Sequence, residues 1–533
     1  MAKLVNLDCL LALIIFLYVY TAAADDPSTI FSLTPEREQQ LLFGQMFDHA
    51  ACPGPEAYAK ISLKHELQKR LSKSAGVHLR EEETFSLVDA RYTNYKRPEY
   101  IAAVQVAEEK DVVEVVNYAR SRGIKFAARA GGHGLTTSLR RITNAIAIDM
   151  RGLNSVKYDE NKRQVTVGGG ITTGEFANAT HALGMEVTVG SCPCTGVLGI
   201  SLGAGIGRLQ GKYGYLNDNM VSVRLLLANG TIVEASDDVN PDLFWALRGA
   251  GHNFGIALEA TYQVYPQQNE GQHYVVDFEF TLDKVESIFE AVNAVSDPMP
   301  EELAIFVIGR RRGANGEVGL AMTNPGWRFC GLLTTYTPLA DNQRQPRVLG
   351  SAEGCRTLRE AIRCDLPVWK DAKTAAWDAL PWATYNGLNN VLCTPEGWAR
   401  FPVKNFYGAN VKRYDIPTMR DYFDGWRHMN QKYGTRAMFS VMFESFAQQR
   451  VRGIPDGTTA YPWRHGSQHF LRRATGDFNN TSTMGTVPKT PPEALYGYEQ
   501  WRLQKLRRLK GEYDPEGLFN GYQPFVMEAE LDG

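Results

Sequence analysis

Residues 189–207, VGSCPCTGVLGISLGAGIG, combine two cysteines with a run of glycines. Further upstream, Gly131-Gly132-His133 forms a second glycine-rich turn. Glycine allows the backbone to come very close to a flat or phosphorylated ligand. Each turn also carries one reactive side chain, Cys192 or His133. We therefore expect the two turns to grip one ligand, and the rest of the chain to frame it.

The length and composition indicate a folded, multidomain protein. A chain of 533 residues is too long for one ordinary core, so two or three domains are expected. The content of 44% hydrophobic and 22% charged residues is typical of a soluble globular protein. A formal net charge of -2 gives no reason to expect a nucleic-acid partner.

The N-terminal residues predict a signal peptide. Lys3 precedes an apolar run over residues 10–20, and three alanines at 22–24 follow it. This run is too short to span a bilayer and ends in an A-x-A pattern. We expect cleavage after about Ala24, a secreted protein and no stable membrane anchor. A buried first helix is the alternative.

The cysteine count fits a secretory route. Of eight cysteines, Cys9 lies in the signal segment, which leaves an odd number in the mature chain. An odd number in a secreted protein indicates one thiol with a separate role, for which Cys192 is the candidate. Four Asn-x-Ser/Thr sequons could accept glycans if exposed: Asn178, Asn229, Asn479 and Asn480.

The chain divides into segments by pattern. Residues 25–95 predict a helical lead-in to a domain over 96–268. There a strand at 100–107, a helix to Arg122 with Asp111 and Glu114 as its capping box, and a strand at 124–128 form a β-α-β unit. A second such unit has a strand at 165–167, a helix at 172–183 and a strand at 186–189. Further expected elements are a hairpin at 221–235, a helix from 241 and a strand at 257–265.

The later residues predict a second domain over 269–490. We expect an antiparallel sheet covered on one face, which is typical of a substrate-binding domain. Residues 491–533 become helical again over 499–510 and are expected to return to the first domain. The strands expected in the second domain are 274–281, 304–308, 318–322, 436–443 and 467–471, with a helix at 282–295.

A dinucleotide-binding Rossmann site is not expected. The glycines at 203, 205 and 207 follow a G-x-G-x-G spacing rather than G-x-G-x-x-G. The acidic residue that normally follows about twenty positions later is also missing.

Four motifs together resemble one known family. They are residues 129–134, the Cys192-Pro193-x-x-Gly196-Val197-x-Gly199 run, residues 243–249 with Phe254-Gly255-Ile256, and Tyr513-Asp514-Pro515. In order and spacing they are similar to berberine bridge enzyme-like FAD-linked oxidases, of the vanillyl-alcohol oxidase and p-cresol methylhydroxylase (PCMH) superfamily. The resemblance runs from about residue 90 to the C-terminus. It is strong over the first domain and weak over 271–490.

The resemblance implies an α+β fold, in which a PCMH-type FAD-binding domain carries a second α+β domain built on an antiparallel sheet. It also implies FAD bound twice covalently, through His133 to the flavin 8α carbon and through Cys192 to C6. Other residues implied to bind the cofactor are Arg129, Ala130, Gly131, Gly132, Gly134, Ser191, Thr195, Gly196, Gly199, Gly255 and Ile256. No metal site is expected.

Alternatives remain open for three of these residues. His133 could only cap a turn, and Cys192 could be disulfide-bonded. Cys194, two residues away, could compete for the flavin or for a disulfide partner. Thr195 falls where related enzymes control the approach of oxygen, although a threonine could also simply pack.

The catalytic base is not fixed by the sequence. An oxidation needs a base within hydrogen-bond reach of the leaving proton. Tyr461 lies in a segment that resembles the family's aromatic-Pro-His-Arg pattern, with Trp463 in place of histidine. The other candidates are Glu444, His465 and His469. Residues 496–503 do not align clearly with the asparagine and tyrosine that the family usually carries near the flavin.

The leading hypothesis is a secreted oxidase that removes hydride from a small secondary metabolite, as in similar fungal enzymes, and passes the electrons to O2 with release of H2O2. A carbohydrate (oligosaccharide) oxidase is the first alternative. A catalytically silent flavin-binding protein and a dehydrogenase with another electron acceptor are the others.

Overall fold

The computed structural model describes residues 55–296, 298–309, 328–329, 335–338, 369–384, 387–399, 402–433, 437–465, 468–476 and 491–525. The expected signal peptide, the expected strand at 318–322 and the sequons Asn479 and Asn480 lie outside these ranges. The chain divides into two compact units, Met1–Glu66 and Leu67–Gly533. Within the described ranges, no helix is long and apolar enough to cross a membrane.

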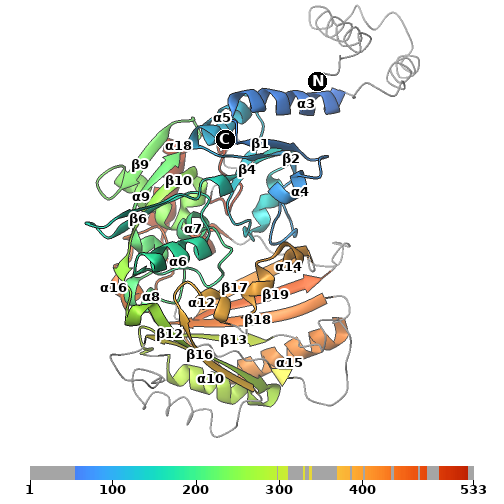
Figure 1. Cartoon of the computed structure of the whole chain (residues 1–533). Coiled ribbons are helices and arrows are strands. Elements are labelled where there is room, and N and C mark those ends of the chain that lie inside the picture. Colours follow the sequence, from blue (N-terminus) through green and yellow to red (C-terminus); the bar gives the residue numbers. More distant parts are fainter. Residues whose placement is uncertain are drawn as a thin grey trace, which may run out of the picture. The chain divides into compact units, whose positions relative to one another are not determined.

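The first domain, residues 67–268, begins with a mixed sheet in the order β1-β2-β4-β3. Its strands are β1 (Gly76–Leu79), β2 (Tyr100–Gln105), β3 (Phe126–Arg129) and β4 (Ala145–Asp149). Strands β2 and β3 both run parallel to β4, and the helix α5 (Glu109–Ser121) connects them (Figure 1). The predicted β-α-β unit is confirmed, with β4 inserted between its two strands. Strand β3 leads directly into the His133 turn.

Two details of the prediction are wrong here. Residues 76–79 were expected in a helical lead-in, but they form β1, which pairs antiparallel with β2 and so belongs to the sheet. The cap of α5 is also shifted, because Glu108 is the N-cap and Asp111 is the third helical residue. The Asp111 side chain accepts hydrogen bonds from the backbone N–H groups of Ala107 (2.9 Å) and Glu108 (3.0 Å).

The strand predicted at 186–189 is β7 (Met185–Glu186), which pairs with β11 (Tyr265–Pro266) rather than with β6, so the second predicted β-α-β unit is wrong. A larger second sheet of the first domain has the order β5-β6-β10-β8-β9. Its antiparallel strands are β5 (Val156–Asp159), β6 (Gln164–Gly168), β8 (Met220–Leu226), β9 (Ile232–Ser236) and β10 (Ile256–Gln263). The predicted hairpin is confirmed as β8 and β9. The predicted helices are α6 (Thr173–Ala182), whose N-cap is Thr172, and α9 (Pro241–Ala250). Phe176, Phe244 and Tyr262 are fully buried in the core beside this sheet.

The described residues of the second domain form two antiparallel sheets, where one sheet was expected. One is centred on β12 (Gln272–Thr281), which pairs with β14 (Arg328–Phe329), β15 (Thr335–Pro338) and β16 (Trp369–Ala376). The other has the order β13-β18-β19-β17, formed by Ala304–Gly309, Ala437–Phe446, Gln468–Gly476 and Lys404–Val411. Helices α10 (Val285–Ala294) and α15 (Ile416–Tyr433) pack together against one face of this second sheet, as expected (Figure 1).

The C-terminal residues return to the first domain, as predicted. Helix α17 (Pro492–Tyr496) precedes α18 (Gln500–Tyr513). The buried Lys510 ammonium donates to the carbonyl of Asn253 and to the Asp514 carboxylate, both at 2.6 Å. Asp514 in turn accepts from the N–H groups of Leu518 and Phe519, both at 2.9 Å. This network fixes residues 514–519 against the first domain.

Asp111 provides a test of this part of the fold. Its fully buried carboxylate also accepts from the N–H (2.7 Å) and hydroxyl (2.8 Å) of Ser72. Burial opposes the charge, but the hydrogen bonds outweigh it and lower the pKa of Asp111. We expect Asp111→Asn to reduce the free energy of unfolding by roughly 1.5–3 kcal/mol at pH 7, measured by urea denaturation.

The pH dependence of that loss follows from the lowered pKa. The stabilisation is fully present above the pKa of Asp111 in the unfolded chain and is lost as the pH falls through the lower folded value. The difference between Asp111→Asn and wild type should therefore shrink below about pH 4. A difference that is constant from pH 7 to pH 3 would contradict this assignment.

Candidate cofactor and active site

The two glycine-rich turns touch each other through their backbones. A Cβ added at Gly131 would overlap the carbonyl oxygen of Cys194, and a Cβ at Gly196 would lie 2.8 Å from that of Ala130. Only glycine permits such an approach at these two positions. Hydrogen bonds from the N–H of Thr173 to Thr195 O and from Gly174 to Pro193 O, both 2.8 Å, fix the second turn on helix α6. The sequence therefore brings His133 and Cys192 together, as expected.

The ring of His133 is packed between two aromatic side chains and a backbone carbonyl group. It stacks on Tyr92, with centroids 4.6 Å apart, and meets the edge of Trp398 at 5.4 Å. Nδ1 lies 2.6 Å from the carbonyl oxygen of Gly131, and Nε2 lies 3.5 Å from Sγ of Cys194. Burial lowers the pKa of His133 to about 4. The imidazole is therefore neutral at pH 7 and retains one unprotonated, nucleophilic nitrogen.

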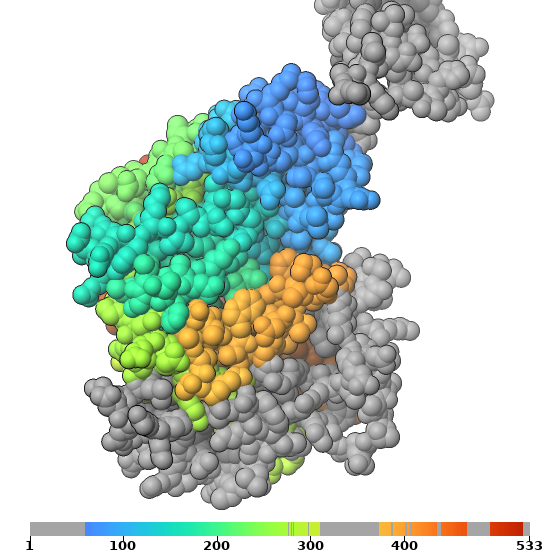
Figure 2. Space-filling model, viewed as in Figure 1, coloured from blue at the N-terminus to red at the C-terminus, as the bar shows by residue number. Residues whose placement is uncertain are grey.

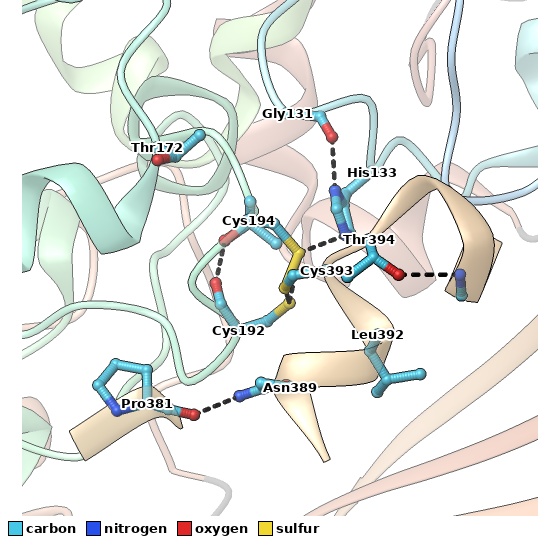
Figure 3. The surroundings of a disulfide bond; sticks show 12 residues. Gly131, His133, Thr172, Cys192, Cys194, Pro381, Asn389, Leu392, Cys393 and Thr394 are labelled. Carbon is cyan, nitrogen blue, oxygen red and sulfur yellow. Dashed lines mark hydrogen bonds between the residues drawn. A yellow bond between two sulfur atoms is a disulfide. The ribbon is translucent and has the colours of Figure 1, made fainter. Parts of the chain in front are cut away.

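Cys192 is the free cysteine of the described residues, and Cys194 is bonded to Cys393. The Cys192 sulfur lies 3.4 Å from Sγ of Cys194 and 3.8 Å from Sγ of Cys393 (Figure 3). The structure thus gives the disulfide to Cys194 rather than to Cys192. Burial raises the pKa of the Cys192 thiol to about 11, so this group is protonated at pH 7.

The disulfide joins the two domains. Cys393 follows α13 (Asn389–Leu392) and precedes α14 (Pro395–Ala399). Asn389 donates from Nδ2 to the carbonyls of Ser191 (3.1 Å) and Pro381 (2.7 Å). Figure 2 shows this part of the second domain, in orange, lying directly against the first domain. Segment 389–399 therefore forms a wall beside His133 and Cys192.

His133, Cys192 and Cys194 place their possible ligand atoms within 4.8 Å of one another. A metal would need thiolates from both cysteines. Because Cys194 is in a disulfide, these three side chains are a poor metal site.

The side chain of Thr195 supports the Cys192 turn. Its hydroxyl donates to the carbonyl oxygen of Cys192 at 2.9 Å, and the hydroxyl of Thr173 donates to the same oxygen at 2.5 Å. This is the packing role considered for Thr195. Its effect on oxygen stays a prediction.

A cavity of about 160 Å³ adjoins the His133 turn. Its wall contains five of the residues predicted to bind cofactor: Arg129, Ala130, Gly199, Gly255 and Ile256. The remaining predicted residues lie in the two turns: Gly131, Gly132, Gly134, Ser191, Thr195 and Gly196. Ligand sites typically measure roughly 300–1,000 Å³, so this cavity suits one part of a dinucleotide.

The lining of this cavity suits part of an FAD molecule. The wall is mainly apolar and glycine-rich, as a flat ring requires. Arg129 adds positive charge, and its buried Nε has no hydrogen-bond partner among the described atoms. A buried donor of this kind is suited to a diphosphate oxygen.

Sequence reasoning missed several residues of this site. His252 and Tyr522 both line the cavity and stack with ring centroids 4.3 Å apart. Burial lowers the pKa of His252 to about 4, so this ring is also neutral. No local sequence signal points to Tyr522, Tyr92 or Trp398, because each reaches the site only through tertiary packing.

Of the candidate bases, Glu444 has the most suitable chemistry. Glu444 lies on β18, where Val441, Phe443 and Ser445 point to the opposite face of the sheet and are buried. Val441 and Phe443 pack against helices α10 and α15. Glu444 therefore faces the side away from these helices, where Met442 and Phe446 join the core shared with the first domain. Burial raises the pKa of Glu444 to about 7, while Arg208 opposes that rise.

The other candidates have different surroundings. Tyr461 packs against Tyr215, with centroids 5.3 Å apart, and burial raises its pKa to about 12. His465 pairs at the surface with Asp456 at 2.8 Å, which makes it an unsuitable base. His469 pairs with Glu444 in the register of β18 and β19.

Two sequons lie within the described residues. Asn178 and Asn229 are both exposed. Asn178 lies inside helix α6, and the Thr180 of its sequon is fully buried. Asn229 lies at the β8–β9 turn, where its side chain accepts from the hydroxyl of Thr231 at 2.7 Å. Glycosylation at all four positions stays a prediction.

Comparison with known proteins identifies an FAD-binding domain in this chain. The family described as FAD binding domain matches residues 100–236. FAD-linked oxidoreductase alt4 of Alternaria solani is 42% identical over 504 residues, covering 87% of this chain and 96% of the relative.

Solved structures agree on the fold. Physcomitrella patens BBE-like 1 matches with a TM-score of 0.69 at 20% identity, over 87% of this chain and 100% of that one. A xylooligosaccharide oxidase from Myceliophthora thermophila matches with a TM-score of 0.67 at 20% identity, over 87% and 99%. At these identities the likeness concerns the α+β, PCMH-type fold.

The match to alt4 extends over nearly the whole of both chains, and the turns and cavity suit the cofactor that its name specifies. The chain therefore belongs to the FAD-linked oxidoreductases and has the fold of the berberine bridge enzyme-like flavoproteins.

Proposed function

We propose that this oxidoreductase is a secreted oxidase that holds FAD through bonds to both His133 and Cys192 and oxidises a small secondary metabolite. One observation carries the proposal. A neutral imidazole and a free thiol converge on two touching turns, and the first of these turns follows directly on a cavity wall that contains five of the residues predicted to bind FAD. The competing sulfur, Cys194, is already bonded to Cys393.

Each residue of the proposed site has a separate role. FAD, when bound, would supply the hydride acceptor of an oxidase that reduces O2 to H2O2. His133 and Cys192 would hold the ring from two turns, and Arg129 would face the diphosphate. Segment 389–399 excludes water from one side of these residues. Glu444 would accept the proton that leaves the substrate as the hydride departs.

Secretion is supported by two features. The first is the signal-like N-terminus. The second is the Cys194–Cys393 disulfide, because disulfides persist mainly in oxidising compartments.

A carbohydrate substrate is the second candidate, favoured by the structural likeness to a xylooligosaccharide oxidase. Peroxide release from xylo-, cello- and malto-oligosaccharides, compared with release from phenolic and alcoholic metabolites, separates the two substrate classes. The same assay under anaerobic conditions with an artificial acceptor separates an oxidase from a dehydrogenase.

The two tethers can be tested by acid precipitation. Wild type should give a yellow pellet, because covalent bonds survive denaturation. His133→Ala and Cys192→Ala should each retain flavin in the pellet through the remaining bond. The double variant should release at least about tenfold more flavin into the supernatant, measured by absorbance of both fractions.

The matched control for the tethers is Cys194→Ala/Cys393→Ala, which removes two neighbouring sulfurs but leaves Cys192 in place. It should keep the flavin in the pellet. A colourless wild-type pellet from FAD-loaded protein would falsify the tethering. Equal retention by the double variant would move the attachment to other residues.

The base can be tested by the pH profile of kcat/KM. A carboxyl with a pKa of about 7 accepts a proton only when ionised, so wild-type kcat/KM should rise with pH through about 7. Glu444→Gln should lower kcat/KM by about 10²–10⁴-fold and abolish this rise. Tyr461→Phe should keep the rise. If Glu444→Gln retains the same profile, another group is the base.

A further inference from the structure

Lys404, the first residue of β17, is a buried cation close to Tyr92 and Trp398, whose rings pack around His133. Its side chain is almost fully buried, and its ammonium donates to the carbonyl oxygens of Tyr92 (2.6 Å) and Trp398 (3.1 Å). Nζ also lies 4.6 Å from the centroid of the Tyr92 ring. One ammonium thus contacts both residues whose rings enclose His133.

The backbone around Lys404 strengthens this connection. Its N–H donates to the hydroxyl of Thr93 at 2.8 Å, and the same hydroxyl donates to its carbonyl at 2.8 Å. The N–H of Asn94 donates to the carbonyl of Pro402 at 2.7 Å. Residues 92–94 of the first domain are therefore joined to residues 402–404 of the second.

The order of contacts runs from Lys404 through Tyr92 to His133. The Tyr92 and His133 rings are nearly parallel, at 15°, whereas Trp398 stands at 83° to His133. One nitrogen of the His133 ring, Nδ1, is hydrogen-bonded to the carbonyl oxygen of Gly131. Tyr92, Trp398 and Gly131 surround the rest of the imidazole. Its other nitrogen, Nε2, is therefore directed toward Sγ of Cys194 (Figure 3).

We propose that Lys404 is a positioning residue for His133, whose ammonium holds Tyr92 and Trp398 together and so fixes the orientation of the imidazole. Burying an ammonium is unfavourable unless it is hydrogen-bonded, and Lys404 is bonded to two carbonyls. The expected effect of Lys404 on the rate of flavin attachment rests on the proposed bond between His133 and flavin. Its expected effect on the orientation and pKa of His133 does not depend on that bond.

Lys404 also affects the charge of His133. The charged or titratable groups around this ring are Lys404, Arg91, Arg129, Tyr92 and Cys192. Burial is the main cause of the lowered pKa of His133, and the positive charges of Lys404, Arg91 and Arg129 lower it further. Removing the Lys404 charge should raise that pKa, which a purely structural role would not predict.

The first experiment measures His133 without flavin. Full-length, flavin-free protein with labelled histidine is titrated by NMR, and His133→Ala assigns the signal. Lys404→Met should move the midpoint of His133 upward from about 4, whereas Lys404→Arg should leave it low. Lys432→Met is the matched control, since Lys432 also lies on a tyrosine ring (5.3 Å) but is exposed. An unchanged midpoint in Lys404→Met would overturn the electrostatic part of the proposal.

The second experiment isolates each tether. In a Cys192→Ala background, FAD can attach only through His133. Adding Lys404→Met there should slow the formation of covalent flavin by about tenfold, because small displacements reduce the rates of positioned reactions. In a His133→Ala background, Lys404→Met should change the rate at Cys192 much less. Equal slowing in both backgrounds, or none in either, would contradict a specific role.

Failure of the proposed function is distinguishable from failure of this inference. If the Cys192→Ala protein forms no covalent flavin but Lys404→Met still raises the His133 midpoint, the positioning role stands and the tether fails. Should Lys404→Met not fold, Tyr92→Leu removes the ring while keeping the carbonyl that Lys404 contacts. It should also slow attachment through His133, and wild-type kinetics would contradict the proposal.

Discussion

The arrangement of the site depends on the backbone contact between the two glycine-rich turns. Gly131 and Gly196 allow residues 130–131 and 194–196 to meet where any larger residue would overlap a neighbour. This contact places an imidazole and a thiol from distant parts of the sequence beside one another. The same turn extends into the cavity wall through Arg129 and Ala130. The cavity wall and the two reactive side chains are thus held by the same pair of turns.

The chemistry of the two side chains follows from burial. Without a close counter-ion, burial favours the neutral form of both, with the pKa of His133 at about 4 and that of Cys192 at about 11. The neutral histidine is ready to act as a nucleophile at pH 7. The protonated thiol is not, because a thiolate is the reactive species. The two proposed bonds to flavin should therefore form with different pH dependence.

Much of the fold could be predicted because local signals agree with tertiary packing. Helix α6 and the β8–β9 hairpin follow from periodicity and turn signals in the sequence. The prediction failed at β1, where Gly76–Leu79 is a strand only because β2 lies beside it. It also failed at the α5 cap, where Glu108 and Asp111 form the capping box instead of Asp111 and Glu114. The convergence of His133 and Cys192 was predictable from motif order. The packing of Tyr92, Trp398 and Lys404 around His133 was not predictable, because these residues lie in three separate segments without a shared motif.

The proposed bonds from His133 and Cys192 to one flavin can be tested by mass spectrometry of proteolysed, reduced and alkylated holoprotein. We expect a single species that contains the His133 peptide, the Cys192 peptide and the mass of one FAD, with Cys194 and Cys393 alkylated. Detection of both peptides only in unlinked, flavin-free form would contradict this proposal.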